Sequence, residues 1–282
     1  MLFLIVLGVL SSIVGGAFAY IGYKIEQPPV GPPHAVRRAH PDRPMLIVLG
    51  DSHAHGRVGT DWVGRLRGAE ANSLVVGNAG HNGDVTWTAA QRLPACLEAR
   101  PDAMVLMIGS NDVMAADLPA RAAIYMRQQK LPQIPNMTWS EGQLNALLRE
   151  MTRSVRHVAV CTIPPLGPEP DAPIEVAVRA WNEHVRKVAS KHQVPVLDVH
   201  AALNPLNEGG HRPYVGAWSA TLREISGAVA QRYLLGRSWD AIADRRGFGL
   251  TTDGIHLPDR AAPPIVGLVQ EWLSTLDLQP PD

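Results

Sequence analysis

Short apolar runs alternate along the chain with longer stretches in which apolar residues recur every three or four positions. The runs show no polar alternation, which is typical of strands buried on both faces of a parallel sheet. The longer stretches have the spacing of amphipathic helices. We predict strands at residues 45–49, 73–76, 103–108, 157–162 and 194–199, and helices at residues 85–99, 142–155, 174–192 and 261–276. This alternation predicts an open α/β layer fold, interrupted by insertions at residues 113–141 and 203–250.

The first 23 residues are a separate element, because none of them is charged. A helix of this length, at about 1.5 Å per residue, extends roughly 35 Å, which is sufficient for a bilayer core of about 30 Å. We predict a transmembrane anchor over residues 1–23. A cleaved signal peptide is the alternative, since Ala17, Phe18 and Ala19 resemble a small-x-small cleavage site. The basic residues that follow favour a cytoplasmic domain and the cleavage-like motif favours secretion, so the side of the membrane stays open.

Residues 24–43 are rich in proline and are predicted to form an extended linker, which places the folded domain at residues 44–282. Lys and Arg equal Asp and Glu at 26 each, so the basic excess typical of a nucleic-acid-binding protein is missing. The two cysteines, Cys96 and Cys161, are too few for a disulfide scaffold and fit no zinc motif. We expect Cys161, inside an apolar run, to be a buried free thiol.

Small and polar residues gather where the predicted strands end. Each such cluster also occurs in ordinary turns and helix caps. Three of them follow predicted strands and a fourth lies far downstream; their joint occurrence indicates a site at the carboxyl edge of the sheet. The clusters are Gly50-Asp51-Ser52-His53, Asn78-Ala79-Gly80 with Gly83-Asp84, Gly109-Ser110-Asn111-Asp112, and Thr252-Asp253-Gly254-Ile255-His256.

These four motifs, in this order, resemble those of the SGNH hydrolase superfamily, the GDSL-type lipases and esterases. They extend over residues 50–256 and so cover almost the whole expected domain. The resemblance implies a three-layer α/β sandwich with a central, mostly parallel five-stranded sheet of the flavodoxin-like kind.

The resemblance also implies roles for the motif residues. Ser52 is expected to be the nucleophile, His256 the base that a serine hydroxyl requires, and Asp253 the group that orients the imidazole. The expected oxyanion hole consists of the backbone N–H groups of Ser52 and Gly83 and the side-chain amide of Asn111. Asp51 is expected to brace the loop. The mechanism requires neither a cofactor nor a metal.

Three histidines in the motif loops depart from the family pattern, in which an apolar residue more often follows the nucleophile. We expect His53, His55 and His81 to be solvated loop residues. The alternative is that they form a polar entrance to the site and contact the substrate. Their irregular spacing does not favour a metal site. The aromatic residues of the insertions are expected to pack on the core, or else to form a substrate-binding wall. They include Tyr125, Trp139, Tyr214, Trp218, Tyr233 and Trp239, with Met126 beside them.

The sequence therefore predicts a serine ester hydrolase that forms an acyl-enzyme with a small-molecule or lipid ester, such as a lipid or an envelope glycoconjugate. The predicted N-terminal helix attaches it to a membrane. An O-acyltransferase that moves the acyl group to a sugar or alcohol hydroxyl shares the same triad and is the first alternative. A non-catalytic binding domain is the second. The sequence leaves acyl-chain length and oligomeric state open.

Overall fold

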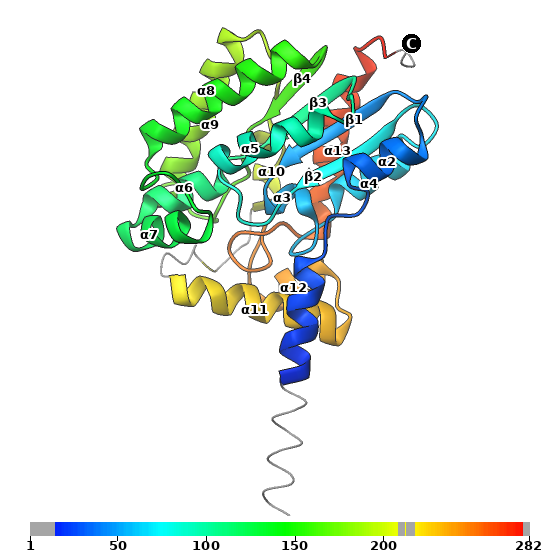
Figure 1. Cartoon of the computed structure of the whole chain (residues 1–282). Helices are drawn as coiled ribbons and strands as arrows, with labels where there is room; N and C mark the ends of the chain where they lie inside the picture. Colours follow the sequence, from blue (N-terminus) through cyan, green and yellow to red (C-terminus); the bar gives the residue numbers. More distant parts are fainter. Residues whose placement is uncertain (1–14, 208–211, 213–217, 279–282) are drawn as a thin grey trace, which may run out of the picture.

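The computed structural model describes residues 15–207, 212 and 218–278. Its centre is a sheet in the order β2-β1-β3-β4-β5, and every adjacent pair is parallel (Figure 1). The sheet is thus wholly parallel in this part of the chain, where the sequence predicts a mostly parallel one. The strands are β1 (Met45–Gly50), β2 (Val75–Gly80), β3 (Ala103–Met107), β4 (His157–Cys161) and β5 (Val196–Leu197).

Burial on both faces explains the apolar runs. Every residue of β1, β2 and β3 is buried. The second strand differs from its prediction, because it runs from residue 75 to residue 80 and includes the polar Asn78. That side chain is tolerated in the interior because its Nδ2 donates to the carbonyl of Ala54 (2.8 Å) and its Oδ1 accepts from the N–H of Gly80 (2.8 Å).

Helices cover both faces of the sheet and make two separate apolar cores, so the fold has three layers (Figure 1). One core holds Met45, Ile47 and Leu49 of β1, and the other holds Leu46 and Val48. The first face carries α5 (Thr86–Leu97), α8 (Met137–Ser154) and α9 (Pro173–Lys191); the second carries α4 (Trp62–Ala69), α10 (Val199–Leu203) and α13 (Ala262–Ser274). Alternating strand residues therefore stabilise opposite layers.

The described parts of the two insertions are mainly helical. The remaining elements are α2 (Pro33–Ala39), α3 (Ser52–His55), α6 (Ser110–Asp117), α7 (Pro119–Gln128), α11 (Trp218–Leu235) and α12 (Trp239–Arg246), with 3-10 turns at Asn204–Asn207 and Asp259–Ala261. In Figure 1, α11 and α12 lie below the sheet beside the helical residues 15–26.

The proline-rich segment differs from an extended linker. It contains α2, which packs on β2, and its carbonyl at Gly31 accepts from the N–H of Asn78 (2.8 Å). Pro33 occupies the first helical position, where its missing N–H costs nothing, so a short helix is compatible with the proline content.

None of the helices within residues 15–207 and 218–278 is long and apolar enough to cross a membrane. Residues 1–14, which make up much of the predicted anchor, lie outside the described part of the chain.

Candidate active site

The strand order reverses direction between β1 and β3, and ligands of open α/β sheets bind at such a point. Asp51 follows β1 directly, and Ser52 begins α3. The carboxylate of Asp51 caps this short helix by accepting from the N–H of His53 (2.9 Å). A Cβ atom at Gly50 would lie 2.4 Å from the carbonyl oxygen of Met107 on β3, so only glycine fits where the chain turns toward the nucleophile. Asp51 is thus the loop brace that the sequence predicts.

A chain of hydrogen bonds links Ser52, His256 and Asp253. Nε2 of His256 lies 3.1 Å from Oγ of Ser52, and Nδ1 lies 2.7 Å from Oδ2 of Asp253. Oδ1 of Asp253 accepts from the N–H groups of Ile255 (3.0 Å) and His256 (2.8 Å), which fixes the carboxylate. The structure therefore brings Ser52 to a histidine that lies 204 positions later in the chain.

The charge of Asp253 suits this geometry. Burial alone would raise the pKa of the Asp253 carboxyl, but the adjacent His256 and the two backbone N–H groups outweigh burial and lower the pKa below its ordinary value. Asp253 is consequently an ionised acceptor for the Nδ1–H of His256. With Nδ1 protonated, Nε2 is the nitrogen that can accept the proton of Ser52.

The other two predicted oxyanion residues, Gly83 and Asn111, follow β2 and β3. Asn111, in the first turn of α6, donates from Nδ2 to the carbonyl of Asp84 (2.9 Å), immediately after Gly83. The hydroxyl of Tyr125 donates to Oδ1 of Asn111 (2.6 Å) and orients the amide. Gly83 has a φ of +80°, and a Cβ atom there would lie 2.7 Å from Nε2 of Gln129. The insertion that contains α7 thus contacts both residues.

A second set of bonds braces the loop after β2, and sequence reasoning missed its central residue, Arg92. Nε of Arg92 donates to Oδ2 of Asp84 (2.8 Å), and its Nη atoms donate to the carbonyls of Ala79 (2.7 Å) and Gly50 (3.1 Å). Arg92 therefore ties the ends of β1 and β2 to the loop that carries Gly83. Nothing in the sequence signals this role, because Arg92 lies inside a regular amphipathic helix.

The prediction of solvated histidines is wrong for two of the three. His53 and His55 are buried, whereas the side chain of His81 is 59% exposed and its Nδ1 lies 2.9 Å from Oδ1 of Asp84. Burial, assisted by the nearby His256, lowers the pKa of His53 to about 3. Burial also lowers the pKa of His55 to about 4. The reason is that α3 packs against β1 and β2, which buries all four of its residues. Among the described residues, no group of three or more His, Cys, Asp and Glu could hold a metal.

The aromatic residues of the second insertion pack where the structure describes them. Trp239 is buried and meets the ring of Tyr233 edge-on, and the hydroxyl of Tyr233 donates to the carbonyl of Arg57 (2.6 Å). Tyr214 and the side chain of Trp218 lie outside the described part. In the first insertion, Tyr125 reaches the site through Asn111, while Trp139 packs beside it and Met126 is exposed.

A family model for the GDSL-like lipases and acylhydrolases matches residues 48–260, which is more than half of the chain. The chain belongs to this family. The resemblance found in the sequence is thereby confirmed, and membership makes the protein a carboxylic ester hydrolase. The search of curated proteins finds no match to this GDSL-like hydrolase.

Solved structures of esterases have the same fold. LAE5, an alpha/beta hydrolase enzyme from the metagenome of Lake Arreo, is 18% identical with a TM-score of 0.55, over 83% of this chain and 96% of LAE5. Axe2, an acetylxylan esterase from Geobacillus stearothermophilus, is 18% identical with a TM-score of 0.54, over 81% of this chain and 93% of Axe2. The lipase/acylhydrolase from Enterococcus faecalis is 19% identical with a TM-score of 0.55, over 85% of this chain and 99% of that chain.

Proposed function

We propose that this GDSL-like hydrolase cleaves carboxylic esters through an acyl-enzyme on Ser52. The observation that carries the proposal is the hydrogen-bonded chain from Ser52 through His256 to Asp253. Nε2 of His256 takes the hydroxyl proton as Oγ of Ser52 attacks the ester carbonyl, and Asp253 stabilises the imidazolium. The tetrahedral intermediate expels the alcohol, which receives the proton from His256. A water molecule, deprotonated by His256, then releases the acid and restores Ser52.

The negative charge of the tetrahedral oxygen requires donors that are already in place. We assign this role to the N–H groups of Ser52 and Gly83 and to the second N–H of the Asn111 amide, whose first N–H is held by Asp84. Loss of one such donor costs about 2.7–4 kcal/mol of transition-state stabilisation.

The substrate class that the site supports best is an ester of a short acyl group on a sugar hydroxyl, as in an envelope glycoconjugate. Ser52 and His256 are only 7% and 6% exposed, which favours a small acyl group. Two of the similar solved structures are acetylxylan esterases, whose names state that they act on acetylated xylan. A lipid ester is the other expected class.

The test uses the full chain in detergent with p-nitrophenyl esters from acetate to octanoate. Ser52→Ala should abolish turnover, and Ser226→Ala, an exposed serine on α11, should leave it unchanged. Acetylated xylooligosaccharide and phosphatidylcholine vesicles then separate the two substrate classes. Turnover that survives Ser52→Ala contradicts the proposed nucleophile.

The enclosed serine also supports transfer to a hydroxyl acceptor other than water as a second candidate function. Both reactions use the same acyl-enzyme, so only the products distinguish them. Incubation with an ester donor and a methyl glycoside should yield more acylated glycoside than free acid if the protein is an O-acyltransferase.

We further propose that residues 1–23 attach the domain to a membrane. Support comes from the absence of charge in this segment and from the exposed Phe18, Tyr20 and Tyr23 on the helical residues 15–26. Tyrosines beside Lys24 suit the membrane–water interface. An alkaline carbonate wash should leave the chain in the membrane fraction, and sequencing of its N-terminus distinguishes an anchor from a cleaved signal peptide.

A further inference from the structure

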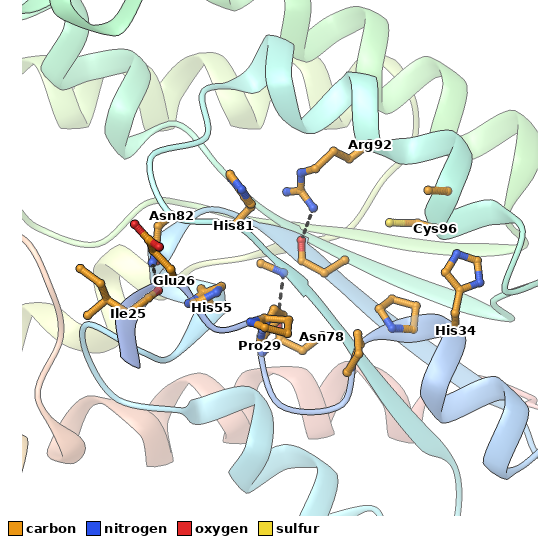
Figure 2. A pocket seen from close by; sticks show the side chains of 16 residues that line it. Ile25, Glu26, Pro29, His34, His55, Asn78, His81, Asn82, Arg92 and Cys96 are labelled. Atoms are coloured by element: carbon orange, nitrogen blue, oxygen red, sulfur yellow. Dashed lines mark hydrogen bonds between the residues drawn. The ribbon is translucent and has the colours of Figure 1, made fainter. Parts of the chain in front are cut away.

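The segment before the predicted domain contacts the loop that carries Gly83. The carbonyl of Ile25 accepts a hydrogen bond from Nδ2 of Asn82 (3.0 Å), and Asn82 is the residue immediately before Gly83 (Figure 2). We call residues 25–31 the N-terminal strap. Oδ1 of Asn82 is buried and has no partner among the described residues, so in this part of the chain the bond to Ile25 is the one hydrogen bond that orients the amide.

The strap also contacts the chain that follows the nucleophile. Nη2 of Arg57 donates to the carbonyl of Pro28 (3.1 Å), and Arg57 lies five residues after Ser52. The carbonyl of Arg57 in turn accepts from Tyr233 on α11. The strap is thus held between the segments that follow β1 and β2, which are the two segments that carry Ser52 and Gly83.

Hydrogen bonds, rather than side-chain packing, hold the strap to the loop. A cavity of about 650 Å³ lies beside it, lined by Ile25, Pro28 and Pro29 of the strap and by His81 and Asn82 of the loop. Asp84 stays held by Arg92 and Asn111. Because side chains do not fill the cavity, the peptide between residues 82 and 83 can shift toward it if the bond between Asn82 and Ile25 is lost.

The position of the Ile25 carbonyl is itself fixed by the helical residues 15–26. The side chains of Ile21 and Ile25 pack against the apolar cluster that contains Val58 and Trp239. Tyr23, on the same helix, is 62% exposed. Packing of these two partly buried isoleucines therefore positions the carbonyl that the loop uses.

We propose that the N-terminal strap is a positioning element for the oxyanion hole. Through Asn82 it holds the peptide between residues 82 and 83 so that the N–H of Gly83 is aimed at the reacting oxygen. The inference rests on the proposed function, in which Gly83 is an oxyanion donor. Its consequence is that residues with no place in the family motifs, and outside the matched residues 48–260, tune the rate of the chemical step.

The experiment compares the full chain in detergent with Asn82→Ala, Asn82→Asp, Ile25→Ser and the Asn82→Ala/Ile25→Ser double variant. Asn82→Asp keeps the shape of the side chain but removes the donor. Tyr23→Ser, on the exposed face of the same helix, is the matched control. Active sites are counted by exhaustive labelling with a fluorophosphonate, and kcat, KM and the rate of phosphonylation are measured per labelled site.

We expect each single variant at residues 25 and 82 to lower kcat by about 10- to 100-fold, because a displacement of about 1 Å at a reacting group has effects of this size. KM should change by less than about twofold, and phosphonylation should slow by a factor similar to that of kcat. The double variant should be no slower than the slower single variant, because both substitutions break one contact. Tyr23→Ser should match the wild type.

A purely structural role would reduce the number of labelled sites and leave kcat per site unchanged, and this result overturns the inference. Additive losses in the double variant overturn it as well. If the wild type turns over esters and the variants equal it, the inference fails while the proposed function stands. If the wild type is not labelled at Ser52, the proposed function fails first, and the role of the strap fails with it.

Discussion

His53 should make the stability of the fold depend on pH. Its imidazole is buried, and neither ring nitrogen has a hydrogen-bond partner among the described residues. Burial, with a smaller contribution from the adjacent His256, lowers its pKa from 6.5 to about 3. Between these two values the unfolded chain binds a proton that the folded chain does not. Protonation of His53 in the unfolded chain therefore costs the fold no stability above pH 6.5, and it lowers the free energy of unfolding progressively as the pH falls toward 3.

The size of the effect follows from the two pKa values. At pH 5 the histidine is mostly protonated in the unfolded chain and neutral in the folded chain, which removes about 2 kcal/mol of stability, whereas at pH 7 almost none is removed. His53→Leu cannot bind the proton in either state. The free energy of unfolding of this variant should therefore rise by about 2 kcal/mol relative to the wild type between pH 7 and pH 5.

The assay is urea unfolding of the full chain in detergent, followed by tryptophan fluorescence at several pH values. The quantity to compare is the difference in the free energy of unfolding between variant and wild type, because Asp51 makes stability depend on pH in the opposite direction. Burial raises the pKa of Asp51 to about 7, so its contribution falls as the pH rises from about 4 to 7, but it is common to both proteins and cancels. Val63→Ala, at another buried position, should differ from the wild type by a constant amount. A constant difference for His53→Leu as well would refute the reasoning.

Two further predictions concern packing around the site. Gly109→Ala should lower the free energy of unfolding by about 3 kcal/mol or more, because its Cβ would lie 2.0 Å from Nε1 of the buried Trp181 at a φ of +130°. Gly68→Ala, whose Cβ meets no atom within 4 Å, should instead raise the free energy of unfolding by about 0.5–1 kcal/mol. Equal urea midpoints for the two variants would contradict this prediction. Tyr125→Phe removes the bond to Oδ1 of Asn111 and should lower kcat about tenfold, as measured by ester turnover. The buried amide oxygen loses its partner, so thermal unfolding should also show a melting temperature lower by about 2–4 °C. An unchanged kcat would show that the amide needs no such support.

The sheet and the catalytic cluster could be predicted because both depend on local patterns. Continuous apolar runs mark strands that are covered on two faces, and β1 and β3 fall within a residue of their predicted ranges. Parallel strands place all their carboxyl ends on one edge, so motifs that follow different strands must lie close together. His256 follows α12 rather than a strand, so its approach to Ser52 is predicted from the family resemblance and not from the sheet geometry.

Contacts between distant segments could not be predicted in the same way. The sequence suggests that His53 is a polar loop residue, but its burial depends on how α3 packs against β1 and β2. Proline content suggests an extended linker, but it does not reveal that the carbonyls of residues 25 and 31 meet donors on Asn82 and Asn78. Each of these features requires a partner that no local pattern specifies.

The two aspartates of the outer motifs show how the same residue type acquires opposite charge states. Burial alone would raise the pKa of both carboxyls. At Asp253, His256 and the backbone N–H groups outweigh burial and keep the carboxylate ionised. At Asp51, burial prevails despite the bond from the N–H of His53, and the group is mostly neutral below about pH 7. Under the proposed mechanism, a negative charge beyond His256 stabilises the imidazolium, whereas one beside Ser52 would repel the developing oxyanion. The carboxyl next to the base is thus ionised, and the carboxyl next to the nucleophile is mostly neutral, which is the distribution of charge that the proposed mechanism requires.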